Sequence, residues 1–223
     1  MRKLSILFFV VFALSAFSQN HYLGVKAGFG LTNVSEPNIF AEEVKMQAAF
    51  MGGLSYEYLI KKHLLLGADL MYRQNGYSYK ISITNSEGMV EGTGRLHNHT
   101  NYVSLPLKAG YLFGDRFSGF VNVGLVPAII LDAYYKLSDP NHVVNNPEDI
   151  RKISYKEYTN NFELSGLLEI GGNYRINNNF LLSTTLITQY GFTEVLKTTT
   201  FNVDMRNDGA YIVFGLKYNL TKN

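Results

Sequence analysis

Apolar and polar residues alternate along most of this chain, and residues 162–175 (FELSGLLEIGGNYR) show the pattern most plainly. Every second residue from Phe162 to Tyr174 is apolar, aromatic or glycine, whereas the intervening positions include Glu163 and Glu169. A period of two predicts a β-strand whose two faces meet different surroundings.

Eight segments alternate in this way, and no extended stretch has the 3.6-residue period of a helix. Their cores are predicted at residues 22–32, 47–59, 64–76, 102–112, 117–132, 162–175, 180–192 and 210–220. Three connections are short, namely 60–63, 114–116 and 176–179. Four are long, namely 33–46, 77–101, 133–161 and 193–209. Short and long connections alternate strictly, which is typical of an up-and-down barrel with turns at one end and long loops at the other.

One face of each predicted strand carries no charged residue. The opposite face carries many glycines and amides, together with four basic and four acidic residues: Lys26, Arg73, Lys108, Lys217, Glu57, Asp69, Glu163 and Glu169. In a soluble barrel of the lipocalin type the apolar face would point inward, whereas in a membrane barrel it meets lipid and the polar face fills the lumen.

The membrane alternative explains the glycines, because an eight-stranded interior has little room for side chains. It also explains tyrosines at strand ends, where an aromatic girdle is expected: Tyr58, Tyr72, Tyr111, Tyr174 and Tyr218. We therefore predict an all-β fold, an eight-stranded antiparallel up-and-down transmembrane β-barrel with short periplasmic turns and long extracellular loops.

The N-terminus indicates export. Arg2 and Lys3 precede an apolar run over residues 4–17 that is shorter than the roughly 20 residues of a membrane-spanning helix. We predict a signal peptide over residues 1–18, cleaved after Ser18, and a barrel domain over residues 19–223 in the cell outer membrane; the alternative is an uncleaved anchor. The chain has no cysteine, so disulfides and thiolate metal sites are excluded.

Charge excludes one class of partner. The chain has 20 Lys+Arg and 18 Asp+Glu, and removal of Arg2 and Lys3 leaves 18 of each. A nucleic-acid-binding protein is expected to carry a basic excess or stripe, so we predict no nucleic-acid partner.

Several strand motifs resemble one known family. They are YLGVKAGFGLTNV near the mature start, NYVSLPLKAGYLF at 101–113, FVNVGLVPAIIL at 120–131 and FELSGLLEIGGNYRINNNFLLSTTLITQYGFTEV at 162–195. These are similar to the outer-membrane β-barrel proteins of Bacteroidetes, often described as PorT-like. The resemblance implies a barrel of about eight strands. Some relatives take part in protein secretion, and most have no assigned activity.

The eight charged residues of the polar face are the main candidate site. Equal numbers of each sign in a narrow lumen predict mutual ion pairs, because an unpaired buried charge is costly. We expect a packed polar core in preference to a conduction path.

His97 and His99 share one strand face just before residue 102. A metal site there lacks a third ligand at a fixed spacing, so we expect a polar pair and no bound metal. A lipid esterase or acyltransferase would combine these histidines with Ser104 or Glu91, but Ser104 lies on the opposite face by parity. We predict no catalytic residues and no cofactor.

The long loops are the candidate contact regions. Residues 77–93 predict a hairpin that turns at NSEG and extends the third and fourth strands beyond the membrane. Asn146 before Pro147 predicts a helix start. Loop tyrosines suit a recognition surface: Tyr77, Tyr79, Tyr134, Tyr135, Tyr155 and Tyr158.

These patterns predict a monomeric, non-enzymatic outer-membrane barrel that acts as a structural or interaction component of the cell envelope, with a secretion-related role implied by the resemblance. Its expected partners are outer-membrane lipid and a protein that contacts the extracellular loops or the periplasmic turns. The alternatives are a narrow porin-like channel and a small lipid-modifying enzyme.

Overall fold

The computed structural model describes residues 20–35, 42–84, 87–138, 152–197 and 205–221. These residues form one antiparallel sheet and a single short 3-10 turn, η3 (Lys156–Tyr158). The strands are β1 (Asn20–Ser35), β2 (Glu42–Ile60), β3 (Leu64–Thr84), β4 (Val90–Ser104), β5 (Leu107–Gly114), β6 (Phe117–Ser138), β7 (Ile153–Ser154), β8 (Phe162–Arg175), β9 (Phe180–Gly191) and β10 (Arg206–Asn219).

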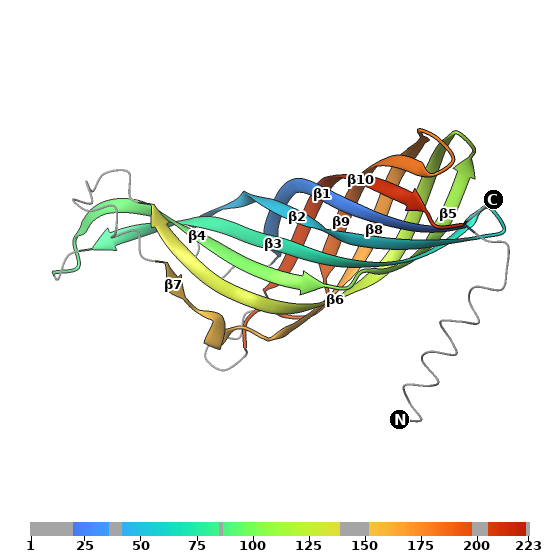
Figure 1. Ribbon diagram of the computed structural model, residues 1–223. Coiled ribbons are helices and arrows are strands. Elements are labelled where there is room, and N and C mark those ends of the chain that lie inside the picture. Colours follow the sequence, from blue (N-terminus) through green and yellow to red (C-terminus); the bar gives the residue numbers. More distant parts are fainter. Residues whose placement is uncertain (1–19, 36–41, 85–86, 139–151, 198–204, 222–223) are drawn as a thin grey trace, which may run out of the picture.

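The sheet closes on itself as a barrel (Figure 1). Strand β1 pairs with β10 on one side and with β2 on the other, so the first and last strands complete the ring. Strands β4 and β5 both pair with β3 and β6, and they are therefore two halves of one barrel strand. Strand β7 pairs only with β6. The ring thus has eight antiparallel strands, which confirms the predicted fold.

The break between β4 and β5 was not predicted, and proline explains it. Pro106 has no backbone N–H, so it cannot contribute a donor to the ladder. The register continues across the break, because the Asp69 amide donates to the Pro106 carbonyl at 2.9 Å and the Leu105 amide donates to the Pro127 carbonyl at 2.9 Å. The predicted segment 102–112 is therefore one interrupted strand.

The two ends of the barrel differ as the connections predicted. The three short turns lie between β2 and β3, β5 and β6, and β8 and β9. At the other end β2 and β6 are longer than predicted. The predicted hairpin that extends the third and fourth strands is confirmed, because Thr84 of β3 pairs with Val90 of β4. These long strands continue past the ends of β8, β9 and β10 (Figure 1). We call this extension, with β7, the outer sheet; it comprises residues 42–46, 76–84, 90–99, 132–138 and 153–154.

The predicted strand faces are confirmed around the ring. Residues of the apolar face point outward and are exposed, and those of the polar face point inward and are buried. On β8, for example, Leu168 is 42% exposed and Glu169 is 1% exposed. Inward glycines relieve crowding as expected, because a Cβ atom at Gly53 would lie 2.0 Å from the carbonyl oxygen of Leu70 on the neighbouring strand.

Aromatic residues surround the barrel at the short-turn end. Phe117 packs against Tyr174 with ring centroids 4.8 Å apart, and Phe180 packs against Tyr218 at 5.2 Å. Tyr58 and Tyr111 pack against two histidines at the same end, His21 and His63. Four of the five predicted girdle tyrosines thus lie at this end. The fifth, Tyr72, lies within β3, because β3 continues to Thr84.

Two predictions fall on residues outside the described ranges: the signal peptide over residues 1–18 and the helix start at Asn146. Within the described ranges, none of the helical segments is long and apolar enough to span a membrane.

Candidate functional site: the barrel lumen

All eight charged residues predicted for the lumen point into it and are buried. They come from six strands, and the ring brings together residues that are far apart in the sequence. They form two groups at different levels. We call them the lysine cluster (Lys26, Lys108, Lys217, Glu57, Asp69 and Glu169) and the arginine cluster (Arg73 and Glu163, with Gln189, Asn207 and Tyr102).

In the lysine cluster each ammonium group contacts at least one carboxylate. Lys108 is central, because its Nζ lies 2.8 Å from Asp69 Oδ2 and 3.2 Å from Glu169 Oε2. Lys26 Nζ lies 3.1 Å from Asp69 Oδ2, and Lys217 Nζ lies 2.6 Å from Glu57 Oε2. Three cations and three anions therefore neutralise one another within the barrel.

Two asparagines complete the lysine cluster. Asn122 Nδ2 donates to Glu169 Oε2 at 2.8 Å, and Lys217 Nζ donates to Asn173 Oδ1 at 3.1 Å. Their position on the polar strand face was evident from the sequence, but their partners depend on the register between strands. Neutral amides satisfy hydrogen-bonding positions that the charged groups leave open, which lowers the cost of burial.

The arginine cluster lies nearer the outer sheet. Arg73 Nη2 lies 2.5 Å from Glu163 Oε1, and Arg73 also donates to the side-chain oxygen of Gln189. Asn207 Nδ2 donates to Glu163 Oε2 at 2.5 Å and to the Tyr102 hydroxyl at 2.9 Å. The guanidinium carbon of Arg73 lies 5.0 Å from the centroid of the Tyr102 ring. The charged pair is therefore held by neutral side chains on several sides.

An apolar layer separates the two clusters. On β3, Met71 is the inward residue between Asp69 and Arg73, and on β8, Leu167 lies between Glu169 and Glu163. The layer contains Ala49, Met51, Met71, Val126, Leu167, Ile187, Tyr211 and Val213. The sequence did not predict this layer, because residue type alone does not distinguish a methionine or leucine that points into the lumen from one that faces lipid. The alternation along each strand could have revealed the layer, because it puts these apolar residues on the same face as the charged ones.

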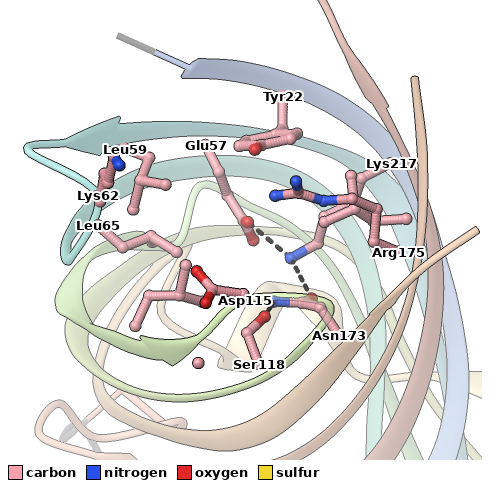
Figure 2. A pocket seen from close by; sticks show the side chains of 13 residues that line it. Tyr22, Glu57, Leu59, Lys62, Leu65, Asp115, Ser118, Asn173, Arg175 and Lys217 are labelled. Atoms are coloured by element: carbon pink, nitrogen blue, oxygen red, sulfur yellow. Dashed lines mark hydrogen bonds and ion pairs between the residues drawn. The ribbon is translucent and has the colours of Figure 1, made fainter. Parts of the chain in front are cut away.

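A cavity of about 200 Å³ lies at the short-turn end and stops at the lysine cluster (Figure 2). Tyr22, Leu59, Leu65 and Leu181 form part of its wall and pack together as a second apolar group. Lys217 lies at its inner end, bonded to Glu57 and Asn173, as Figure 2 shows. The cavity is therefore a shallow mouth, and the cluster lies beneath it.

This layered filling opposes conduction. An ion that crosses the lumen would have to separate buried ion pairs in both clusters, and removal of one partner from such a pair is strongly unfavourable. It would also have to pass the apolar layer, where a few hydroxyl groups such as that of Ser104 are the side-chain groups available to replace its water shell. An eight-stranded lumen is just wide enough for side chains to fill it.

The histidines lie on the outside of the barrel wall. His99 stacks on Tyr134 with ring centroids 5.0 Å apart and lies 2.9 Å from Gln47, through its Nδ1 and the Gln47 Nε2. Burial, and secondarily nearby positive charge, lowers the pKa of both His97 and His99. Both imidazoles are therefore neutral at pH 7. Among the described residues no group of three or more His, Cys, Asp or Glu side chains is arranged to hold a metal ion.

Ser104 lies on the opposite side of the wall from these histidines. It is buried in the lumen, where its Oγ donates to the Met71 carbonyl at 3.3 Å. The outward histidines and the inward hydroxyl therefore do not form a nucleophile and base pair.

Four of the six loop tyrosines pack in two pairs. The Tyr77 and Tyr79 rings have centroids 6.1 Å apart, and the Tyr135 and Tyr155 rings have centroids 5.9 Å apart. Burial raises the pKa of Tyr155 well above its usual value. Tyr158, in η3, is 67% exposed. These tyrosines therefore both stabilise the outer sheet and present an exposed ring.

The chain is similar to several solved structures. The chain is similar to Neisserial surface protein A (14% identity; 89% of this chain and 97% of that chain; TM-score 0.47). It is also similar to OprG from Pseudomonas aeruginosa (11% identity; 92% of this chain and 98% of that chain covered; TM-score 0.45). A third similar structure is the N-terminal β-barrel domain of OprF from Pseudomonas aeruginosa (17% identity; 91% of this chain and 99% of that chain covered; TM-score 0.42). No curated protein sequence is significantly similar to this chain.

A family model decides the assignment. The model for the outer membrane protein beta-barrel domain matches residues 17–197, which is most of the chain. Its description agrees with the closed ring, the apolar outward face and the aromatic girdle. The chain therefore belongs to the family of outer membrane protein beta-barrel domains, and it is a protein of the outer membrane.

Proposed function

We propose that this protein is a non-enzymatic, non-conducting barrel that anchors a contact surface at the outer membrane. The observation that carries the proposal is the filled lumen, in which two ion-paired clusters enclose an apolar layer. Such an interior fits a rigid anchor better than a pathway. The outer sheet then provides the contact surface, because it continues beyond the rest of the barrel and because the turn η3 that follows β7 presents the exposed ring of Tyr158.

Two further features support a structural or interaction role. Ser104 and the histidines lie on opposite sides of the wall, which argues against acyl transfer. The strand motifs resemble PorT-like barrels of Bacteroidetes, and this likeness is the reason to include protein secretion among the processes that the protein serves. The partner that we propose is a protein of the same envelope that contacts the exposed ring of Tyr158.

Site-specific cross-linking in intact cells tests this proposal. A photoreactive phenylalanine analogue at Tyr158 is expected to give a cross-linked protein of defined mass, because this ring is exposed beyond the membrane. The same analogue at Tyr190, which is exposed on the lipid-facing side of β9, serves as the control and should give no defined protein adduct. If Tyr158 in η3 and Leu137 in the outer sheet both give no adduct, the proposed protein contact is wrong.

A further inference from the structure

The outward face of the outer sheet gathers basic residues. They come from β2, β3, β4, β6 and the residue before β7: Lys45, Lys80, Arg95, Lys136 and Lys152. We propose that this basic face binds the phosphate groups of a glycolipid headgroup in the leaflet beside the barrel. The proposal is independent of the protein partner suggested above, because it concerns the side of the sheet and involves neither Tyr158 nor the lumen.

The strand register places these residues together. Lys45 pairs with Ser78, Ser78 pairs with His97, and His97 pairs with Lys136, so one row crosses four strands with a lysine at each end. Lys80 pairs with Arg95 in the next row towards the hairpin tip. Directly paired side chains on one face of a sheet are about 5 Å apart, so the two rows form a continuous surface.

The face keeps a positive surplus after its internal pairs are considered. Glu43 is shared, with Arg95 Nη2 at 3.4 Å from its Oε2 and Lys80 Nζ at 3.9 Å from its Oε1. Lys152 Nζ lies 2.5 Å from Asp132 Oδ2.

Lys45 and Lys136 have no carboxylate within 4 Å among the side chains that the structure describes. Lys136 Nζ instead lies 5.7 Å from the centroid of the Tyr134 ring. Glu42 also pairs with Lys80 in the strand register, so three acidic residues face five basic ones, whereas the barrel domain as a whole has equal numbers of each.

The height of the basic face above the apolar, lipid-facing surface indicates which part of the membrane lies beside it. Below the two rows the outward residues become apolar and exposed, as at Val103, Ile129 and Leu131. His97 is six residues along β4 from Val103, about 20 Å along the strand and, at a tilt of about 45°, about 14 Å above it.

The polar region of a phospholipid leaflet is only about 5–8 Å thick. The basic rows therefore lie at the height of a taller headgroup, such as a phosphorylated sugar. Because the face looks sideways, its neighbours are the headgroups around the barrel. Lysine and arginine are the usual donors to phosphate oxygens.

Lipid titration of the full-length protein tests the assignment. The refolded protein in neutral detergent micelles is titrated with diphosphorylated lipid A and with the same lipid after removal of both phosphates, and binding is measured by native mass spectrometry. The test variant is Lys45→Gln with Lys136→Gln. The control is Lys61→Gln with Lys62→Gln, which removes the same charge from the β2–β3 turn at the opposite end. Folding of each variant is verified by heat-dependent migration on SDS gels.

We expect the unmodified protein to prefer the diphosphorylated lipid at least tenfold. Each lysine near an anionic surface contributes about 1 kcal/mol, so the test variant should lose roughly 25-fold in affinity and the control less than twofold. Equal binding of the two lipids, or an equal loss in the control, would overturn the proposal. A soluble sulfated oligosaccharide that binds as tightly as the lipid would also overturn it, because the face would then serve a soluble polyanion.

Discussion

Arg73→Met is expected to lower the free energy of unfolding by about 3–5 kcal/mol, because it leaves the Glu163 carboxylate buried without its cation. Glu163 is 2% exposed, and the Asn207 side-chain amide, which donates to its Oε2, is neutral. One amide donor cannot replace a guanidinium group. The measurement is a urea titration of the protein folded into lipid vesicles, compared with the unmodified protein.

Two further variants make this result specific. Arg73→Met combined with Glu163→Gln removes both charges, and it should recover most of the lost stability because no unpaired charge remains. Arg95→Met removes an arginine from the partly exposed pair with Glu43, and it should cost no more than about 1 kcal/mol. If Arg73→Met and Arg95→Met have equal effects, the arginine cluster is hydrated and the lumen is not packed as described.

Leu168→Arg is the second large effect that we expect. Leu168 points outward near the middle of β8, where it pairs with Val123 on β6 and Thr188 on β9. An arginine on the lipid-facing side costs about 2–4 kcal/mol near the middle of the bilayer. The same vesicle unfolding titration measures this cost.

Val90→Arg provides the matched control, because it adds the same charge at an exposed position of the outer hairpin. A substitution in water without special contacts is expected to change stability by at most about 0.5 kcal/mol. If Leu168→Arg is tolerated as well as Val90→Arg, then Leu168 faces water and the outward face of the barrel is not covered by lipid.

Strand parity was predictable because a closed barrel imposes one chemical environment on each face. Glu169 and Leu168 are adjacent, and the period of two alone assigns one to the lumen and the other to lipid. The three short turns were predictable for a related reason. Only three or four residues separate the alternating segments at these three places, so the same pattern leaves room only for a turn.

The lengths of the strands were less predictable. Above the membrane both faces of a strand meet water, so the alternation that marks a strand becomes weak in the outer sheet. The hairpin predicted at residues 77–93 extends the third and fourth strands as expected, but residues 133–138, predicted as part of a loop, continue β6. The break at Pro106 could not be predicted from the alternation of apolar and polar residues, because this alternation continues through Pro106 unchanged.

The partners within the lumen could not be predicted from the sequence. Lys26 on β1 contacts Asp69 on β3, and these strands are not neighbours in the sheet. Their contact depends on the curvature and diameter of the ring, which the sequence pattern does not contain. The division into two clusters also depends on Met71 and Leu167, whose residue types alone do not distinguish the lumen from the lipid-facing surface.

The central claim is that the side chains of the barrel close its own lumen. Single-channel recording in planar bilayers tests this claim most directly, with the refolded full-length protein added at a moderate voltage of about 100 mV. Because two ion-paired clusters and an apolar layer lie across the lumen, we predict no steady conductance. A stable, ohmic conductance from the unmodified protein would contradict the claim and support a channel.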